Sequence, residues 1–159
     1  MEIDWFPADQ EFFDYAKEML RSVDTILFGR KTYELMAAYW PSAKDEIAGK
    51  MNNLPKIVFS RTLKKAEWKN TRLISGDATA EVSKLKQQPG RDMVILGSAS
   101  LASSLLQRGL IDEYRVIISP VLIGSGNPLF PRITQRLKLT LKHAKVLGSG
   151  VVILYYQKA

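Results

Sequence analysis

Apolar residues along the first two thirds of the chain follow two patterns in turn, one typical of helices and one typical of buried strands. After Pro7 they recur every three or four positions from Phe12 to Val23, which predicts an amphipathic helix. Short apolar runs with turn residues at their ends predict strands at 25–28, 56–59, 72–74 and 93–96. Helical spacing between these runs predicts helices at 30–36, 78–87 and 98–107.

The pattern changes after Glu113. Strands are predicted at 114–119, 136–142 and 151–157, with no helix between them. A chain that begins as alternating strands and helices and ends as a meander is expected to form an α/β fold. This would be a mixed, mostly parallel central sheet flanked by helices, with an antiparallel C-terminal meander. The length of 159 residues and the hydrophobic content of 46% suit a single domain spanning residues 1–159.

Charge is unevenly distributed along the chain. Lys and Arg number 23 against 16 Asp and Glu, for a net charge of +7. Residues 1–60 hold 7 basic and 10 acidic side chains, whereas residues 61–159 hold 16 basic and 6 acidic ones. An anionic partner is therefore expected to meet the surface built by the later segment, and a phosphorylated small molecule and a nucleic acid both fit that charge.

Residue usage excludes several kinds of site. The chain has no cysteine and one histidine, His143, so disulfides, thiolate metal centres and clusters of histidine ligands are excluded and no metal site is expected. His143 adjoins an alternating run, which favours a histidine near the end of a strand. No apolar stretch is long enough to span a membrane, and the acidic N-terminus differs from a signal peptide, so a cytoplasmic location is expected.

Three polar turns follow predicted strands at their C-terminal ends. In an open α/β sheet, ligands bind at that edge, where helix N-termini offer unpaired N–H groups to phosphates. Glycine lets the backbone approach an anion, and arginine supplies forked donors. The P-loop and the three-glycine dinucleotide motif are both absent, and a plain turn or a solvated arginine is the alternative at each position. The turns are Gly29-Arg30-Lys31-Thr32, Ser60-Arg61-Thr62 and Gly97-Ser98-Ala99-Ser100.

Several segments together resemble the dihydrofolate-reductase-like proteins. They are 24–34, 57–63, 95–100, 109–114 and 120–126, and the similarity extends over about residues 5–157. The most similar branch is the reductase domain of the bacterial bifunctional riboflavin-biosynthesis deaminase-reductase, with its stand-alone relatives. The resemblance implies a dihydrofolate-reductase-like fold, an NADPH cofactor and hydride transfer to a pterin-like or pyrimidine-like heterocycle. It also implies a homodimer in which the C-terminal strands take part.

The resemblance assigns roles to particular residues. Along the cofactor phosphates it places Gly29, Arg30, Lys31 and Thr32; near the adenosine 2′-phosphate Ser60, Arg61 and Thr62; and at the pyrophosphate Gly97, Ser98, Ala99, Ser100 and Leu101. Substrate contacts are implied for Phe13, Pro120, Gly124 and Gly126. Asp9 is the implied catalytic acid, with Asp14 less well placed on the same helix. A plain role for Asp9 in the first turn of that helix is the alternative.

One departure from the family concerns the start of the fold. Family members open with a hydrophobic central strand and a Ser-x-Asp-Gly segment, and this chain matches only after that point. Two sheet edges are then expected to be exposed, and catalysis by the chain as given is expected to be impaired. Two alternatives to a reductase therefore remain: an NADPH-binding protein of the same fold without turnover, and a basic nucleic-acid-binding domain. The second is weakened because Lys138 and Lys142 alternate with leucines and no aromatic residues interleave with the basic ones.

Overall fold

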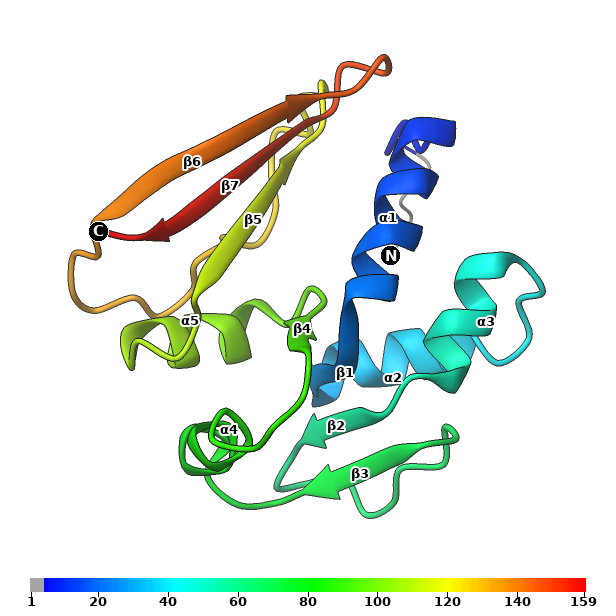
Figure 1. Cartoon of the computed structure of the whole chain (residues 1–159), viewed down its shortest axis with the longest axis vertical. Helices are drawn as coiled ribbons and strands as arrows, with labels where there is room; N and C mark the ends of the chain where they lie inside the picture. The colour runs from blue at the N-terminus through cyan, green and yellow to red at the C-terminus, as the bar shows by residue number, and fades with distance from the viewer. Residues whose placement is uncertain (1–4) are drawn as a thin grey trace.

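The computed structural model describes residues 5–159, and the acidic residues 1–4 lie outside the described part. Helices and strands alternate in the first two thirds, and strands alone follow (Figure 1). The helices are α1 (Gln10–Ser22), α2 (Arg30–Tyr39), α3 (Glu46–Asn53), α4 (Ala78–Leu85) and α5 (Ala99–Gln107). The strands are β1 (Val23–Gly29), β2 (Lys56–Phe59), β3 (Thr71–Ile74), β4 (Asp92–Ile95), β5 (Glu113–Ile118), β6 (Leu139–Val146) and β7 (Val152–Lys158).

The strands form two sheets. A parallel sheet has the order β3-β2-β1-β4, and an antiparallel sheet has the order β5-β7-β6. The predicted α/β fold with parallel strands first and an antiparallel meander last is therefore confirmed. The antiparallel strands make a separate sheet rather than an edge of the parallel one, because β4 and β5 do not pair within the described residues. Within the described residues both sheets are open, so β3 and β4 are the edge strands of the parallel sheet, and β5 and β6 are those of the antiparallel sheet.

Both faces of the parallel sheet are covered. On one face, Ile26, Phe28 and Val58 pack against α1, α2 and α3; on the other, Leu27, Ile57 and Phe59 pack against α4 and α5. Since neighbouring residues of a strand point to opposite faces, a strand covered on both sides is apolar at consecutive positions. This explains the continuous apolar runs of β1 and β2.

Helix α1 connects the two sheets. Leu20 in its last turn belongs to the core of the parallel sheet, whereas Phe12 and Tyr15 pack on Ile153 and its buried neighbours in the antiparallel sheet. Phe13, one of the implied substrate contacts, is 42% exposed. It lies beside the stripe that Phe12, Tyr15 and Leu20 form at spacings of three and five.

The last hairpin differs from its predicted boundaries. β6 covers Leu139–Val146 instead of 136–142, and residues 119–138 form a long loop before it. The register places Leu141, Ala144 and Val146 opposite apolar residues of β7. This pairing of apolar positions moves the strand toward the C-terminus, past the alternating Leu/Lys run on which the prediction was based.

Candidate functional site

Two of the five described helices begin without a side-chain cap. Asp9, Asp45 and Asp77 cap α1, α3 and α4, and each accepts a hydrogen bond from a first-turn amide. The N-cap residues of α2 and α5 are Gly29 and Ser98, and neither makes such a bond. The first-turn amides of α2 and α5 therefore stay available to a ligand, at the end of a helix that carries positive partial charge.

The N-termini of α2 and α5 are held together by a pair of reciprocal hydrogen bonds. The Gly29 amide donates to Ser98 Oγ at 3.0 Å, and the Ser98 amide donates to Thr32 Oγ1 at 3.1 Å. Gly97 and Ser98 both have positive φ, 60° and 50°. A Cβ added to Gly97 would lie 3.4 Å from the Thr32 methyl group, so glycine suits this position in both conformation and space. These four residues with the two helix N-termini are called the candidate phosphate site below.

The turn after β2 lies at the same edge of the sheet. Gly29 is in register with Phe59, so Ser60 follows one residue beyond it. Ser60 Oγ accepts hydrogen bonds from the Thr62 amide at 3.2 Å and the Leu63 amide at 2.9 Å, which fixes the turn. Within residues 5–159, Arg61 is exposed and has no ion pair. Its guanidinium is available to an anion next to the candidate phosphate site.

The other residues assigned to the cofactor lie nearby in different environments. Arg30 already pairs with Glu34 along α2, at 2.9–3.0 Å. Lys31 and Ser100 are exposed, Ala99 is half-buried, and Leu101 packs in the core with 8% exposure. The structure therefore gathers the three predicted turns at one edge, while the contact of each residue with a cofactor stays a prediction.

Asp9 is held by backbone donors on both sides. Its Oδ1 accepts from the Phe12 amide at 2.8 Å and its Oδ2 from the Ser149 amide at 3.1 Å. The bond from Phe12 is the main cause that lowers the pKa of the Asp9 carboxyl, so Asp9 is ionised at neutral pH. The pKa of Asp14 is lowered too, by Lys17 first and Gln10 second. The geometry shows Asp9 as a cap that ties α1 to the β6–β7 hairpin, and its catalytic role stays a prediction.

Replacing Asp9 by alanine is expected to lower the thermal midpoint at pH 7, because Phe12 and Ser149 then lose their acceptor. The folded-state pKa of Asp9 is below the unfolded one, so its stabilisation is present above the unfolded pKa, 3.8, and is lost as pH falls through the folded pKa. The difference between wild type and Asp9→Ala should therefore shrink below about pH 4 in thermal melts. A constant difference down to pH 2 would contradict this assignment.

The predicted substrate residues occupy exposed positions. Phe13 projects from α1, and Pro120, Gly124 and Gly126 lie in the loop between β5 and β6. Pro120 approaches the β6–β7 turn, since a Cβ on Gly150 would lie 3.3 Å from its Cγ. None of the four lines the cavity of about 580 Å³ between α1 and the antiparallel sheet, which Tyr15, Lys17, Arg115 and Tyr155 help to line. Their role with substrate stays a prediction.

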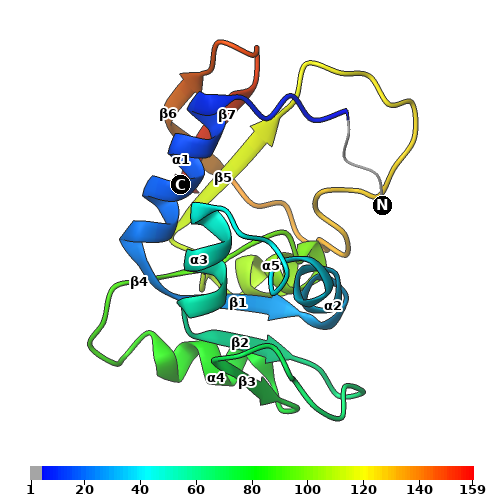
Figure 2. The ribbon, with the colours of Figure 1, turned by 90° about the vertical axis from the view of Figure 1, so that its right-hand side faces the viewer.

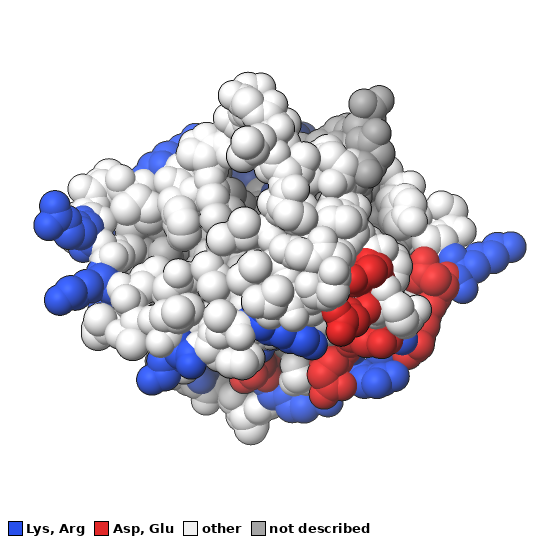
Figure 3. Space-filling view, turned by 90° about the horizontal axis from the view of Figure 1, so that it is seen from above, with Lys and Arg blue, Asp and Glu red and all other residues white. Residues whose placement is uncertain are grey.

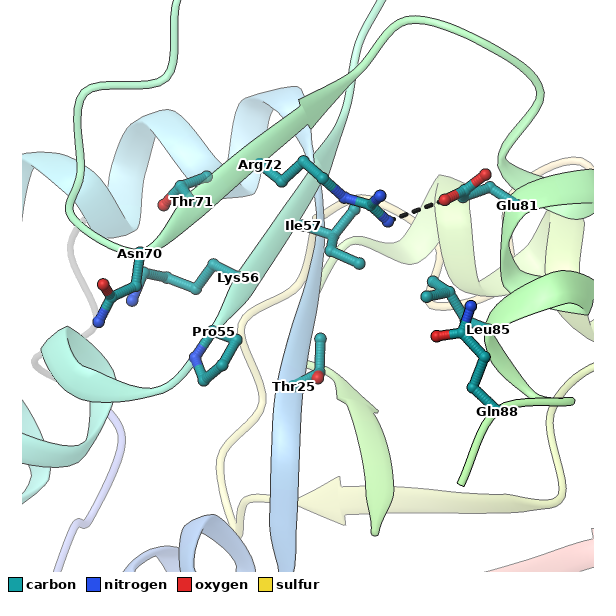
Figure 4. A pocket seen from close by; sticks show the side chains of 10 residues that line it. All are labelled: Thr25, Pro55, Lys56, Ile57, Asn70, Thr71, Arg72, Glu81, Leu85 and Gln88. Carbon is teal, nitrogen blue, oxygen red and sulfur yellow. Dashed lines mark hydrogen bonds and ion pairs between the residues drawn. The ribbon is translucent and has the colours of Figure 1, made fainter. Parts of the chain in front are cut away.

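A second cavity of about 580 Å³ lies at the opposite edge of the parallel sheet, where the strands begin. In Figure 4, Arg72 of β3 reaches across it to Glu81 of α4, and the two side chains form an ion pair of 2.8 Å. Leu85 and Gln88 complete that side of the hollow. Because parallel strands end at the other edge, this cavity is separate from the candidate phosphate site.

Sequence reasoning missed a buried cation beside this region. Lys56 is 1% exposed, and its Nζ donates to the carbonyl oxygens of Met51 at 2.8 Å and Leu54 at 2.7 Å, with Asn52 at 3.3 Å. The ring of Trp68 lies 4.5 Å from the same nitrogen. Burial lowers the pKa of Lys56 to about 8. Nothing in the run Lys-Ile-Val-Phe distinguishes this lysine from an exposed one, because its acceptors belong to the end of α3.

The surface carries no broad basic area on the face seen in Figure 3, where Lys and Arg lie along the margins of an uncharged region.

In the described part of the chain, no three His, Cys, Asp or Glu side chains come together as metal ligands. Nor does any helix there have the length and apolarity needed to cross a bilayer.

Comparison with known proteins decides the family. The model of the RibD C-terminal domain matches residues 4–153. The chain belongs to the RibD C-terminal domain family. RibD C-terminal domains are of the reductase type and use a nicotinamide cofactor. The chain is 36% identical over 162 residues to the uncharacterized Bacillus subtilis protein YyaP, covering 98% of this chain and 84% of YyaP.

Solved structures of RibD-like proteins share the fold. A putative riboflavin biosynthesis protein from Shewanella sp. PV-4 superimposes with a TM-score of 0.78 at 20% identity, covering 99% of this chain and 88% of that one. A Thermotoga maritima diaminohydroxyphosphoribosylaminopyrimidine deaminase/5-amino-6-(5-phosphoribosylamino)uracil reductase gives a TM-score of 0.66 at 14% identity, covering 99% and 54%. At these identities the structures support the fold and leave the substrate to other evidence.

Proposed function

We propose that the protein is an NADPH-dependent reductase that transfers hydride to a pyrimidine-like or pterin-like heterocycle. The observation that carries the proposal is the pair of uncapped helix N-termini joined by Gly29, Thr32, Gly97 and Ser98. Two adjacent sets of amides can bind the two phosphates of a dinucleotide. The structural likeness to the Thermotoga maritima 5-amino-6-(5-phosphoribosylamino)uracil reductase supports a heterocyclic substrate.

The residues present fit a dinucleotide. The α2 and α5 amides would hold the pyrophosphate, the positive φ of Gly97 would let the backbone approach it, and Arg61 with Lys31 would face additional phosphate charge. Arg61 is the residue expected to favour NADPH over NADH, through the 2′-phosphate. NADPH when bound supplies the hydride, and the chain's own residues bind and orient it.

Asp9 is proposed as the group that orients the heterocycle. Its ionised carboxylate keeps lone pairs beyond the two backbone bonds, and these can accept a hydrogen bond from a ring N–H. The test is Asp9→Asn, which keeps an oxygen acceptor for the cap but removes the charge. Asparagine keeps only one of the two acceptor oxygens, so the thermal midpoint should fall by less than in Asp9→Ala. A fall in kcat of about 100-fold, measured where the variant is fully folded, supports the role, and an unchanged kcat leaves Asp9 as a cap alone.

A carboxylate placed at the α5 N-terminus should change dinucleotide affinity without lowering the stability of the fold. Ser100 is exposed at the second helical position of α5. Ser100→Asp is expected to leave stability unchanged or slightly raised, since an acid is favourable there, yet to weaken NADPH and NADH binding about 10-fold or more by repelling the pyrophosphate. Ser104→Asp, one turn further along α5 and also exposed, is the matched control and should change dinucleotide affinity little. Equal affinities for wild type and Ser100→Asp, measured by calorimetry, would contradict the site.

The antiparallel sheet supports a homodimer. One face is apolar in three cross-strand rows, since Tyr114, Val116 and Ile118 align with Tyr156, Leu154 and Val152, and these with Leu141, Ala144 and Val146. Phe130 of the long loop contacts Tyr114, with ring centroids 5.0 Å apart. Ile118, Leu141 and Val146 remain 48%, 51% and 70% exposed. We therefore propose that this face pairs with the same face of a second chain.

Val146→Lys tests the dimer. Val146 is 70% exposed in the single chain, so the substitution should change the stability of the monomer little. Light scattering after size exclusion should give about twice 17.9 kDa for the wild type and about 17.9 kDa for the variant. Lys142→Ala, on the same strand, is the control and should keep the wild-type mass. A wild-type mass of a single chain at micromolar concentration would contradict the proposal.

A further inference from the structure

The cavity between α1 and the antiparallel sheet has no part in the proposed reductase site. Its volume of about 580 Å³ lies in the range of small-molecule sites. The start of α1 is bonded to the β6–β7 turn through Asp9 and Ser149, whereas Leu20 near its end belongs to the core of the parallel sheet. Figures 1 and 2 show α1 beside the antiparallel sheet, and in Figure 1 the strands run away from the helix below that turn. The cavity therefore follows from the way in which α1 joins the two sheets.

An arginine stacked on a tyrosine lies on the sheet side of this cavity. Arg115 of β5 is in register with Tyr155 of β7, and its Cζ lies 5.0 Å from the centre of the Tyr155 ring. Its Nε donates to Glu113 Oε1 at 2.6 Å, and the same guanidinium also donates to the hydroxyl of Tyr15 on α1. A guanidinium has five N–H donors. These two bonds and the ring hold Arg115 in place and leave further donors for a ligand.

Lys145 of β6 supplies a second cation to the same cavity. It is exposed, and in the part of the chain that the structure describes it has no ion pair. The two cations that α1 contributes are already paired, Lys17 with Asp14 at 2.8 Å and Arg21 with Glu46 at 2.9 Å. The unpaired charge of the cavity is therefore on its sheet side, where the free donors of Arg115 also lie.

The rest of the lining favours a small ligand over a polymer. Tyr15, Met19 and Tyr155 give the cavity apolar surface that suits a flat ring. Asp14 and Glu18 of α1 also line it, and their side chains are 59% and 79% exposed. These two carboxylates would repel the phosphates of a nucleic acid that ran along the helix, whereas a single phosphate group can lie on the sheet side.

We propose that this cavity binds an aromatic phosphate monoester, with the phosphate at Arg115 and Lys145 and the ring against Tyr15, Met19 and Tyr155. The planar fork of a guanidinium matches two phosphate oxygens, and the ammonium group adds a point charge. The site is separate from the candidate phosphate site, with which it shares no residue. Because its lining comes from α1, β5, β6 and β7, the bound ligand holds α1 against the antiparallel sheet.

Calorimetric titration with phenyl phosphate tests the site, and inorganic phosphate is the comparison that lacks the ring. The wild type should bind phenyl phosphate with a Kd below about 1 mM and inorganic phosphate at least about tenfold more weakly. Lys145→Gln should weaken the binding of phenyl phosphate at least about fivefold, because it removes the unpaired charge. Arg115→Lys keeps the charge but removes the fork, and should weaken it about tenfold. Lys142→Gln, on the same strand but outside the cavity lining, is the matched control and should leave the affinity unchanged.

The candidate phosphate site is a second place where phenyl phosphate can bind, and Ser100→Asp separates the two. This variant should keep the wild-type affinity for phenyl phosphate, and Lys145→Gln should keep the wild-type affinity for NADPH. A chain that binds phenyl phosphate in this way but no dinucleotide would leave the cavity assigned and remove the reductase proposal. No binding of phenyl phosphate at 1 mM, equal binding of inorganic phosphate, an equal loss in Lys142→Gln, or a loss in Ser100→Asp alone would overturn the inference.

Discussion

Replacing Arg61 by alanine is expected to lower the affinity for NADPH about 10- to 100-fold and to leave the affinity for NADH unchanged. Arg61 has no ion pair within residues 5–159. It lies in the turn after β2, and β2 is the neighbour of β1, the strand that leads into α2. A charge-assisted hydrogen bond to phosphate contributes about 1.5–3 kcal/mol, which gives a change of this size. NADH lacks the 2′-phosphate and gains nothing from the guanidinium.

The matched control is Arg72→Ala, which removes an exposed arginine from the opposite edge of the same sheet. Its effect on either dinucleotide should be small. Calorimetric titration of both variants with both dinucleotides separates the outcomes. An equal loss for NADPH and NADH in Arg61→Ala would place this residue at a shared phosphate, and no loss would remove it from the site.

Replacing Lys56 by methionine is expected to lower the free energy of unfolding at pH 7 by about 2–4 kcal/mol. Methionine fills similar space, but the carbonyl oxygens of Met51 and Leu54 lose their ammonium donor at the end of α3. A buried acceptor left without a partner costs about 1–3 kcal/mol. The control is Lys69→Met, at the exposed residue that follows Trp68. It should change the free energy of unfolding by no more than about 0.5 kcal/mol. Urea unfolding followed by tryptophan fluorescence measures both.

The pH dependence of Lys56 gives an independent check. The pKa of Lys56, about 8, lies below the ordinary lysine pKa of 10.5, so the unfolded chain binds more protons between these two values. The contribution of Lys56 to stability therefore rises with pH from about 8 to about 10.5. The wild type should gain stability relative to Lys56→Met across this window. Parallel pH curves for the two proteins would contradict the assignment of the lowered pKa to Lys56.

Local patterns were sufficient to predict most elements of the fold. The apolar run 56–59 matches β2 residue for residue, because a strand buried on both faces has a signal that depends on its own residues. The start of β6 was misplaced because its boundary depends on register with β7, which the alternating residues 137–141 do not contain. The split into two sheets likewise depends on which strands pair at a distance.

The three turns of the candidate site were predictable from the sequence, but the hydrogen bonds that join them were not. Glycines after strands indicated the edge, but the bonds from Gly29 to Ser98 and from Ser98 to Thr32 join residues more than sixty positions apart. The lack of side-chain caps on α2 and α5 became evident only by comparison with α1, α3 and α4, which aspartates cap. For Asp9 the sequence left a cap and an acid both open, and the geometry shows the cap.

The most direct test of the central claim is calorimetric titration of the unmodified chain with NADPH and, separately, with NADH at moderate salt. We expect one site per chain, micromolar affinity for NADPH and at least about tenfold weaker binding of NADH. Binding of neither dinucleotide, or equal binding of both, would contradict the assignment of this sheet edge to NADPH.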